Sequence, residues 1–255
     1  MAEQLILERL CENLTRLRLP RIKEALSETI KTAESESWSY LTLLDRLLEE
    51  EVAKKEQRRI ESVLKLSGLP WVKTLDDFDF AFQPGINRQQ IAGLFDLSFL
   101  ERKENILLLG PPGVGKTHLS VALAVKACQA GSTIHFTTMS DLIHKLRADR
   151  ESGRIGKNRR PYQWSNLVVV DEVGYTPIDR EECNLFYQFV AMRYEKASTI
   201  ISSNKAFDEW SELFHDPVIV TAILDRLLHH SVVVNIKGSS YRLPNKLSAN
   251  PQPGQ

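Results

Sequence analysis

The sequence of 255 residues predicts an α/β fold, in which a five-stranded parallel sheet is flanked by helices and preceded by a small all-α domain. Two observations lead to this prediction. After residue 105, five short apolar runs alternate with helical patterns, which is typical of a parallel sheet covered on both faces. Residues 3–67, by contrast, contain one proline and no glycine, and their leucines recur at helical spacing.

The helical N-terminal domain is expected over residues 1–67, with helices separated by a break at Pro20. We expect a longer helix over residues 41–66, stopped by the following Ser-Gly-Leu-Pro. The side chains expected on its buried side are Leu44, Leu47, Leu48 and Val52. The first helix is indicated by the spacing of Leu7, Leu10, Leu14 and Leu17. Such a segment can serve only for packing, or it can dock a partner, DNA or a second copy, and both readings stay open.

The remaining chain divides into a connector over 68–105, a core over 106–248 and a flexible tail over 249–255. The strand-like runs are 106–109, 133–137, 167–170, 199–202 and 232–236. The helical patterns between them are 117–129, 140–146 and 181–194. Ligands bind such sheets beyond the carboxyl ends of the strands, so the residues that follow each strand are the candidates for function.

The residues after the first strand match the phosphate-binding pattern G-x-x-x-x-G-K-[ST] in full. They are Gly110, Pro111, Pro112, Gly113, Val114, Gly115, Lys116 and Thr117, and with His118 they form the predicted ATP site. The loop and the following helix N-terminus direct backbone N–H groups at phosphate oxygens. Lys116 supplies positive charge for the β- and γ-phosphates, and the Thr117 hydroxyl supplies a ligand for Mg²⁺.

Acidic residues follow the third strand, at the same predicted edge of the sheet. Asp171 can hold Mg²⁺ through water, and Glu172 can act as a general base on the water that attacks the γ-phosphate. Asn204 follows the fourth strand and can bind that water or the γ-phosphate, although an Asn in this position is often a turn former.

Arg226 lies after an apolar helical stretch and just before the last strand. It could reach the γ-phosphate of a neighbouring subunit and stabilise the transition state. The alternative is a salt bridge with a nearby acid such as Asp225 or Glu209. The spacing alone does not separate these two readings.

These motifs together resemble the AAA+ ATPases, and more closely the IstB-type proteins of insertion sequences, which are related to the DnaC and DnaI helicase loaders. The segments that carry the resemblance are the leucine-rich start, Phe78-Asp79-Phe80, 105–117, 167–175, 201–204, 222–231 and Gly238-Ser239-Ser240-Tyr241-Arg242. The resemblance implies that Asp171 and Glu172 are the Walker B pair, Asn204 is sensor 1 and Arg226 is the arginine finger. Only 19 residues follow Ile236, so a full C-terminal lid does not fit, and Arg242 is expected to be a surface or interface residue.

A local excess of basic residues is the candidate DNA contact, because the whole chain is neutral, with 33 basic and 33 acidic residues. Residues 145–160 contain seven basic and two acidic side chains, and we expect DNA phosphates to bind Arg154, Lys157, Arg159 and Arg160. A merely solvated charged face is the alternative.

The sequence therefore predicts an ATPase with ATP and Mg²⁺ as cofactors. The resemblance implies a homo-oligomer that assembles on double-stranded DNA and delivers it to an IstA-type transposase. A helicase loader is the alternative, while the Asp171-Glu172 pair, Asn204 and Arg226 argue against a small-molecule P-loop kinase. No apolar run approaches the roughly 20 residues that span a membrane, and the three cysteines lack metal-ligand spacing, so we expect a cytoplasmic protein.

Overall fold

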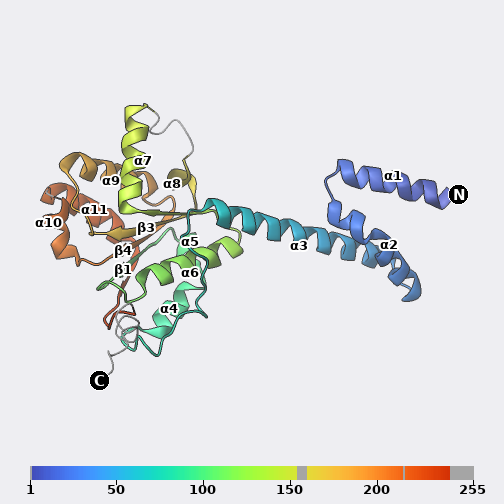
Figure 1. Ribbon diagram of the computed structural model, residues 1–255, viewed down its shortest axis with the longest axis horizontal. Helices are drawn as coiled ribbons and strands as arrows, with labels where there is room; N and C mark the ends of the chain where they lie inside the picture. The colour runs from blue at the N-terminus through green and yellow to red at the C-terminus, as the bar shows by residue number, and fades with distance from the viewer. Residues whose placement is uncertain (1, 154–159, 215, 242–255) are drawn as a thin grey trace, which may run out of the picture. The chain divides into compact units, whose positions relative to one another are not determined.

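The computed structural model describes residues 2–153, 160–214 and 216–241. The chain forms two compact units, Met1–Ser62 and Val63–Gln255. The boundary falls near the C-terminal end of helix α3 (Tyr40–Leu66), which stops where Gly68 adopts a positive φ of 80° (Figure 1). Among the described residues, no helix is long and apolar enough to cross a membrane.

The N-terminal unit consists of α1 (Ala2–Arg16), α2 (Pro20–Ser35) and most of α3. Pro20 occupies the first turn of α2, where its missing N–H group has no intrahelical partner to lose. The apolar core of this unit is small, and its buried members are Leu14, Ile22, Leu26 and Leu47. The helices were predictable from sequence, but the side chains that they bury were predicted only in part.

The predicted buried side of α3 is wrong. Of the four side chains expected there, Leu47 is buried at 6% exposure, whereas Leu44, Leu48 and Val52 are each more than half exposed. The side that α1 and α2 cover runs instead through Leu43, Leu47 and Glu51. Three of the four predicted positions are thus displaced by one residue from the covered row, and one residue corresponds to about 100° around a helix.

Glu51 explains part of this orientation. Its carboxylate is buried at 2% exposure and accepts hydrogen bonds from the backbone N–H groups of Arg21 (2.8 Å) and Ile22 (3.0 Å). These groups belong to the first turn of α2 and have no partner within the helix. A carboxylate in this position also interacts favourably with the positive end of the helix dipole, so α3 docks through a charged residue that an apolar pattern does not reveal.

The second unit contains the predicted five-stranded parallel sheet. Its strands are β1 (Asn105–Leu109), β2 (Ile134–Thr138), β3 (Leu167–Val173), β4 (Ser198–Ser203) and β5 (Ser231–Asn235). They lie in the order β2-β3-β4-β1-β5, so the first strand is flanked by the last two. This order brings the carboxyl ends of β1, β3 and β4 together at one edge, although long segments separate them in the sequence.

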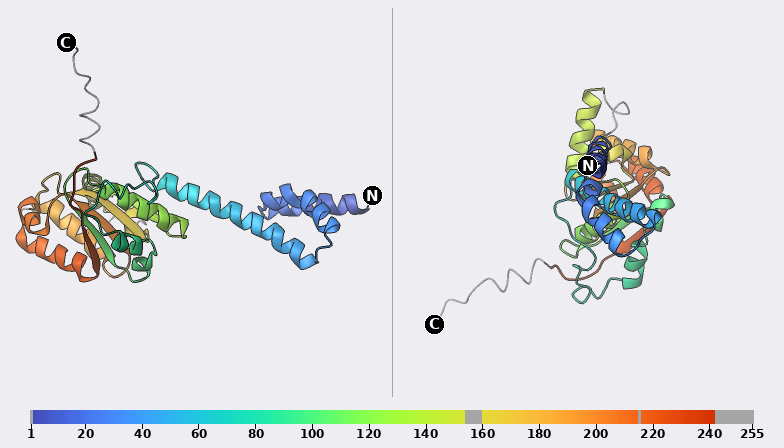
Figure 2. Two further views of the ribbon diagram at one scale, coloured as in Figure 1. Left: turned by 90° about the horizontal axis from the view of Figure 1, so that it is seen from below. Right: turned by 90° about the vertical axis from the view of Figure 1, so that its right-hand side faces the viewer.

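Helices cover both faces of the sheet, as Figures 1 and 2 show. Helix α6 (Lys116–Gln129) packs against β1, β2, β3 and β4. Helices α7 (Met139–Glu151), α9 (Arg180–Arg193) and α11 (Pro217–His229) share one apolar cluster with side chains of β1, β3 and β4. The shorter elements are α4 (Arg88–Leu94), α5 (Ser98–Glu101), α8 (Pro161–Trp164), η1 (Phe207–Glu209) and α10 (Trp210–Phe214).

The predicted connector over 68–105 contains the two short helices α4 and α5, so it is more structured than expected. The predicted tail over 249–255 lies outside the described residues. The domain limits proposed from sequence therefore stay a prediction.

Candidate nucleotide-binding site

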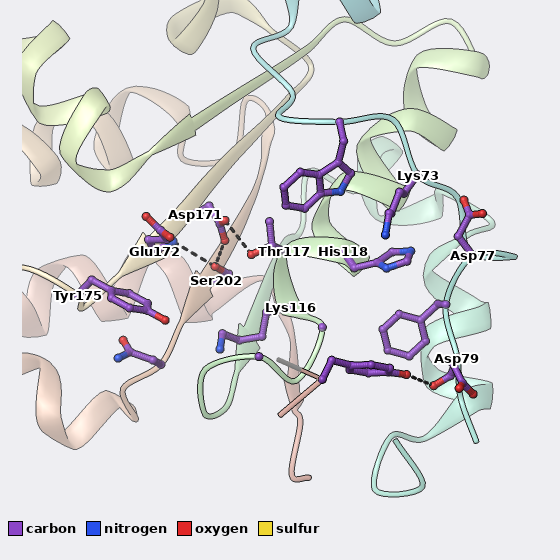
Figure 3. A pocket seen from close by; sticks show the side chains of 16 residues that line it. Lys73, Asp77, Asp79, Lys116, Thr117, His118, Asp171, Glu172, Tyr175 and Ser202 are labelled. Carbon is purple, nitrogen blue, oxygen red and sulfur yellow. Dashed lines mark hydrogen bonds between the residues drawn. The ribbon is translucent and has the colours of Figure 1, made fainter. Parts of the chain in front are cut away.

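A cavity of about 320 Å³ lies beyond the carboxyl ends of β1, β3 and β4 (Figure 3). Eight of the residues predicted for ATP, metal or catalysis line it, namely Gly113, Gly115, Lys116, Thr117, His118, Asp171, Glu172 and Asn204. The sheet order thus collects side chains from three separate strand ends around one space.

The P-loop requires glycine where its backbone turns most sharply. Gly110 has a φ of 150°, and a Cβ atom there would overlap the carbonyl oxygen of Ile236. Gly115 has a φ of 99° and is the N-cap of α6, where a Cβ atom would meet the ring of Phe78. Side chains are therefore excluded from the two ends of the loop, and the first N–H groups of α6 remain without intrahelical partners.

Lys116 lies across this loop and is buried at 7% exposure. Its Nζ donates hydrogen bonds to the carbonyl oxygens of Gly110 (2.6 Å) and Pro111 (2.8 Å). An ammonium group held in this way is positioned over the loop that would surround a phosphate. It can exchange carbonyl acceptors for phosphate oxygens without leaving the site.

Thr117 and Asp171, the two residues predicted to hold a metal, are in direct contact. The Thr117 hydroxyl donates to Asp171 Oδ2 (2.8 Å), and the Ser202 hydroxyl donates to Oδ1 of the same carboxylate. Asp171 is buried at 4% exposure. A hydroxyl beside a buried carboxylate offers the hard oxygen ligands that Mg²⁺ prefers, so these residues fit the ion that the sequence predicts.

Glu172 lines the same cavity as Asp171 because β3 is irregular at this point. Consecutive side chains of a regular strand point to opposite faces. Here the pairing of β3 with β4 shifts between Val170 and Val173, and Glu172 has a positive φ of 61°. The Glu172 N–H group donates to Ser202 Oγ (3.2 Å), which supports this conformation. The irregularity allows two successive carboxylates to serve one site.

Asn204 contributes an unused acceptor to the cavity. Its Oδ1 is buried, and within the described part of the chain no donor forms a hydrogen bond with it. Buried polar atoms are normally paired, so this oxygen is suited to a donor that enters the cavity. A water molecule or a nucleotide group can provide that donor.

Arg226 is separate from these residues. It does not belong to the described lining of the cavity, and its Nη1 donates to the carbonyl oxygen of Ala222 (3.0 Å). Its guanidinium carbon lies 4.8 Å from the ring centroid of Tyr187 in α9. Neither Asp225 nor Glu209 forms an ion pair with Arg226 in the described structure, where Glu209 pairs with Lys205 (2.6 Å). The alternative salt bridge with Asp225 or Glu209 is thus not formed, and Arg226 does not belong to the described lining of the cavity of its own chain.

One wall of the cavity was not predicted from the sequence. This wall comes from the predicted connector and from the last described residues, and its members are Trp71, Lys73, Asp77, Phe78, Asp79 and Tyr241. The Phe78 ring lies 5.3 Å from the imidazole of His118, and the Tyr241 N–H group donates to the carbonyl oxygen of Gly113 (2.9 Å). Hydrogen bonds from Thr74 lower the pKa of Asp77. The aromatic cluster around Phe78 was the available signal, but only the fold brings it to the P-loop.

Most of the residues predicted to contact DNA lie outside the part of the chain that the structure describes. Arg154, Lys157 and Arg159 lie outside the described residues. Arg160 is described, and its guanidinium forms an ion pair with Asp149 (2.6 Å). On α7, Arg147 pairs with Glu182 (2.8 Å), so part of the basic excess is offset by acidic residues. Arg242 also lies outside the described residues.

The sheet order, the P-loop and the converging carboxylates define the class of P-loop proteins with an AAA+ fold. Solved structures support this fold. The structure of DnaI is similar with a TM-score of 0.54 at 17% identity, and the match covers 64% of this chain and 90% of that one. AMPPCP-bound DnaA from Aquifex aeolicus is similar with a TM-score of 0.52 at 20% identity, covering 71% and 56% of the two chains.

The particular family follows from sequence. The family of IstB-like ATP binding proteins matches residues 12–249, and the chain belongs to that family. A putative ATP-binding protein of insertion sequence IS21 from Pseudomonas aeruginosa is 46% identical over 92% of this chain and 89% of its own length. A putative ATP-binding protein of IS5376 from Geobacillus stearothermophilus is 44% identical over 94% and 95%.

Proposed function

We propose that this chain binds ATP with Mg²⁺ and hydrolyses the γ-phosphate bond, and that the bound nucleotide controls its action in transposition. The observation that supports the proposal is the convergence of Lys116, Thr117, Asp171, Glu172 and Asn204 on one cavity. A nucleotide-binding site alone needs only the first three of these. The additional carboxylate and the unused amide oxygen are the groups that hydrolysis requires.

Each residue has a distinct role in the proposed reaction. Lys116 and the N–H groups of the loop offset the negative charge of the phosphates. Thr117 and Asp171 would hold Mg²⁺, which would supply positive charge next to the phosphates. Glu172 accepts a proton from the attacking water, and Asn204 orients that water through its side-chain amide.

Arg226 completes the site from a neighbouring subunit in this proposal. The described lining of the cavity includes the base but not the arginine, and Arg226 is half-buried against Tyr187. A shared site makes hydrolysis dependent on assembly, because only adjacent subunits combine base and arginine. Assembly of a homo-oligomer on double-stranded DNA would then set the rate of turnover.

The partner that we propose is an IstA-type transposase, to which the oligomer would deliver target DNA. Relatives at 46% and 44% identity carry insertion-sequence names and align over nearly the whole chain. The likeness to DnaI at 17% identity concerns the fold alone, so it adds nothing specific in favour of helicase loading.

Two substitutions test the catalytic proposal. Lys116→Ala removes the charge placed over the phosphates, and we expect nucleotide titration to show loss of tight ATP binding. Glu172→Gln keeps the size of the side chain and removes the base, so ATP should still bind while the steady-state hydrolysis rate falls by about 10²–10⁴-fold. Parent-like ATP affinity in the first variant, or parent-like turnover in the second, would refute the assigned role.

A pull-down tests the partner. Duplex DNA and the transposase should be retained together with the Glu172→Gln variant in ATP, and released in ADP. Retention of a replicative helicase instead, with no transposase, would favour the loader.

A further inference from the structure

A second group of potential ligands lies outside the nucleotide cavity, at the C-terminal ends of α9 and α11. Glu195, His229 and His230 each offer one metal-ligand atom, and these atoms all lie within 4.8 Å of one another. The distance to Glu195 Oε1 is 3.9 Å from His229 Nδ1 and 3.7 Å from His230 Nε2. None of these residues is used in the proposed ATPase reaction.

The local chain geometry creates this cluster. Helix α11 ends at His229, and His230 is its C-cap, so the two imidazoles emerge where the helix gives way to β5. On the other side, Glu195 follows α9 with a positive φ of 56°. The N–H groups of Lys196 and Ala197 both donate to the carbonyl oxygen of Arg193, which closes the turn around Glu195. The turn brings the carboxylate to the histidine pair, although 34 residues separate Glu195 from His229.

We propose that Glu195, His229 and His230 bind a divalent transition-metal ion of the zinc class. Two imidazoles and one carboxylate are a ligand set that Zn²⁺ accepts, with water completing the coordination. Imidazole ligands favour such ions over Mg²⁺ and Ca²⁺, so this site is chemically distinct from the one at Asp171.

The two distances to Glu195 are close to what coordination requires, and the ligand atoms of the two histidines lie within 4.8 Å of each other. Metal–ligand bonds of about 2.0–2.2 Å place two ligands of a tetrahedral ion about 3.3 Å apart. The two distances to Glu195 exceed this value by a few tenths of an ångström. All three side chains are more than half exposed, so rotamer adjustments can close the gap without moving the core.

Tyr194 is the competing group in the metal-free chain. Its hydroxyl lies 2.7 Å from His229 Nδ1, the atom that faces Glu195. When the hydroxyl donates to Nδ1, it occupies the lone pair that a metal ion would take. Metal binding therefore requires the phenol to release Nδ1, and removal of the phenol oxygen should not weaken the site.

A bound ion would join the end of α11 to the turn after α9. These are the helices that Arg226 and Tyr187 already link through their cation–π contact. Arg226 lies about one turn before His229, so the ion would restrain the helix that presents the proposed arginine finger. This consequence rests on the proposed function, whereas metal binding itself does not.

The test is a Zn²⁺ titration of the untagged full-length protein against a chromophoric chelator, without nucleotide. We expect one site per chain, and at least about tenfold weaker binding after His229→Ala or His230→Ala, because each change removes a direct ligand. His144→Ala is the matched control, since His144 is an exposed histidine on α7 and its loss should leave the affinity unchanged. Circular dichroism should verify that each variant folds.

Two further measurements make the result decisive. Tyr194→Phe should bind Zn²⁺ at least as tightly as the parent. Substitution by Co²⁺ should give a visible spectrum without thiolate charge-transfer bands, which excludes the half-buried Cys11 as the ligand. Absence of Zn²⁺ binding, equal affinity in the parent and both ligand variants, or thiolate bands would overturn the proposal. The ATPase rate of the zinc-free protein, measured with Mg²⁺ present, tests the proposed function independently.

Discussion

Apolar side chains are buried to different extents at the carboxyl edge of the sheet and in the N-terminal helical unit. At the sheet edge, β1, β3 and β4 are covered on both faces, and nearly every side chain in them is buried. In the N-terminal unit, α3 contacts other helices along one row only, so Leu44, Leu48 and Val52 remain exposed. An apolar run thus predicts buried side chains reliably in a strand that is covered on both faces. It predicts them poorly in a helix that is covered along one side only.

The same contrast extends to polar groups. The sheet edge concentrates Asp171, Glu172 and Asn204 around one cavity, where the buried Oδ1 of Asn204 has no hydrogen-bond partner among the described residues. In the helical unit, the buried charge of Glu51 is satisfied by the N-terminus of α2. Satisfied polar groups hold a fold together, whereas unsatisfied ones at a cavity indicate a ligand.

The prediction with the largest expected effect tests whether the cavity needs Arg226 for hydrolysis. Arg226→Ala should leave ATP binding intact, because Lys116, Thr117 and Asp171 are unchanged. The hydrolysis rate should fall by about 10³–10⁵-fold, as it does when arginine fingers are lost in other systems. A steady-state phosphate-release assay and a nucleotide titration measure the two quantities.

A mixing experiment decides where Arg226 acts. The Glu172→Gln subunit retains the arginine and the Arg226→Ala subunit retains the base, so mixed oligomers should recover part of the activity. If no activity returns at any ratio, although mass measurement confirms mixed oligomers, Arg226 acts within its own chain or only supports the fold.

A prediction of intermediate size tests the difference in burial between adjacent leucines of α3. Leu47→Ala removes a side chain from the small core of the N-terminal unit and should destabilise that unit by about 2–5 kcal/mol. The adjacent Leu48 is 52% exposed, so Leu48→Ala should change the stability by less than about 0.5 kcal/mol. Hydrogen exchange of α1 and α2 amides in the full chain measures both. Equal effects would mean that the row through Leu48 is covered in solution.

The smallest expected effect concerns the pH dependence of the free energy of unfolding, which should differ between the two units. His135 in β2 is buried at 8% exposure, and both ring nitrogens lack hydrogen-bond partners among the described residues. Burial, together with the positive charges of Lys145 and Arg193, lowers the pKa of His135 from 6.5 to about 4. The unfolded chain therefore holds more protons than the folded chain between these values, and the free energy of unfolding falls as the pH is lowered from 6.5 to 4.

The loss expected from His135 is at most about 3 kcal/mol in this range. Chemical denaturation of the core at pH 7 and pH 5 should show it, and His135→Leu should reduce the difference. None of the six histidines precedes His118, so the N-terminal unit lacks this contribution. An unchanged pH difference in His135→Leu would assign the acid sensitivity to other groups.

The sequence by itself determined the α/β class, the five strands within a few residues, and the identity of the P-loop. These features depend on local physics, because buried strands need apolar runs and a phosphate loop needs glycines at positions with positive φ. It also pointed to Asp171, Glu172 and Asn204, since the carboxyl ends of parallel strands lie at one edge. Even so, the turn at Glu172 that directs two successive carboxylates to one cavity was not visible in the pattern.

Only the tertiary structure decided which side chains face one another across long stretches of chain. Phe78 reaches the P-loop from the connector that precedes β1, and Tyr241 reaches it from the residues that follow β5, and no local pattern encodes that meeting. The buried row of α3 depends on Glu51 binding the start of α2, a contact across 30 residues. Hydrophobic periodicity and composition indicate whether each segment forms a helix or a strand. Which surfaces of these elements pack together depends on the summed packing and hydrogen bonding of the whole unit.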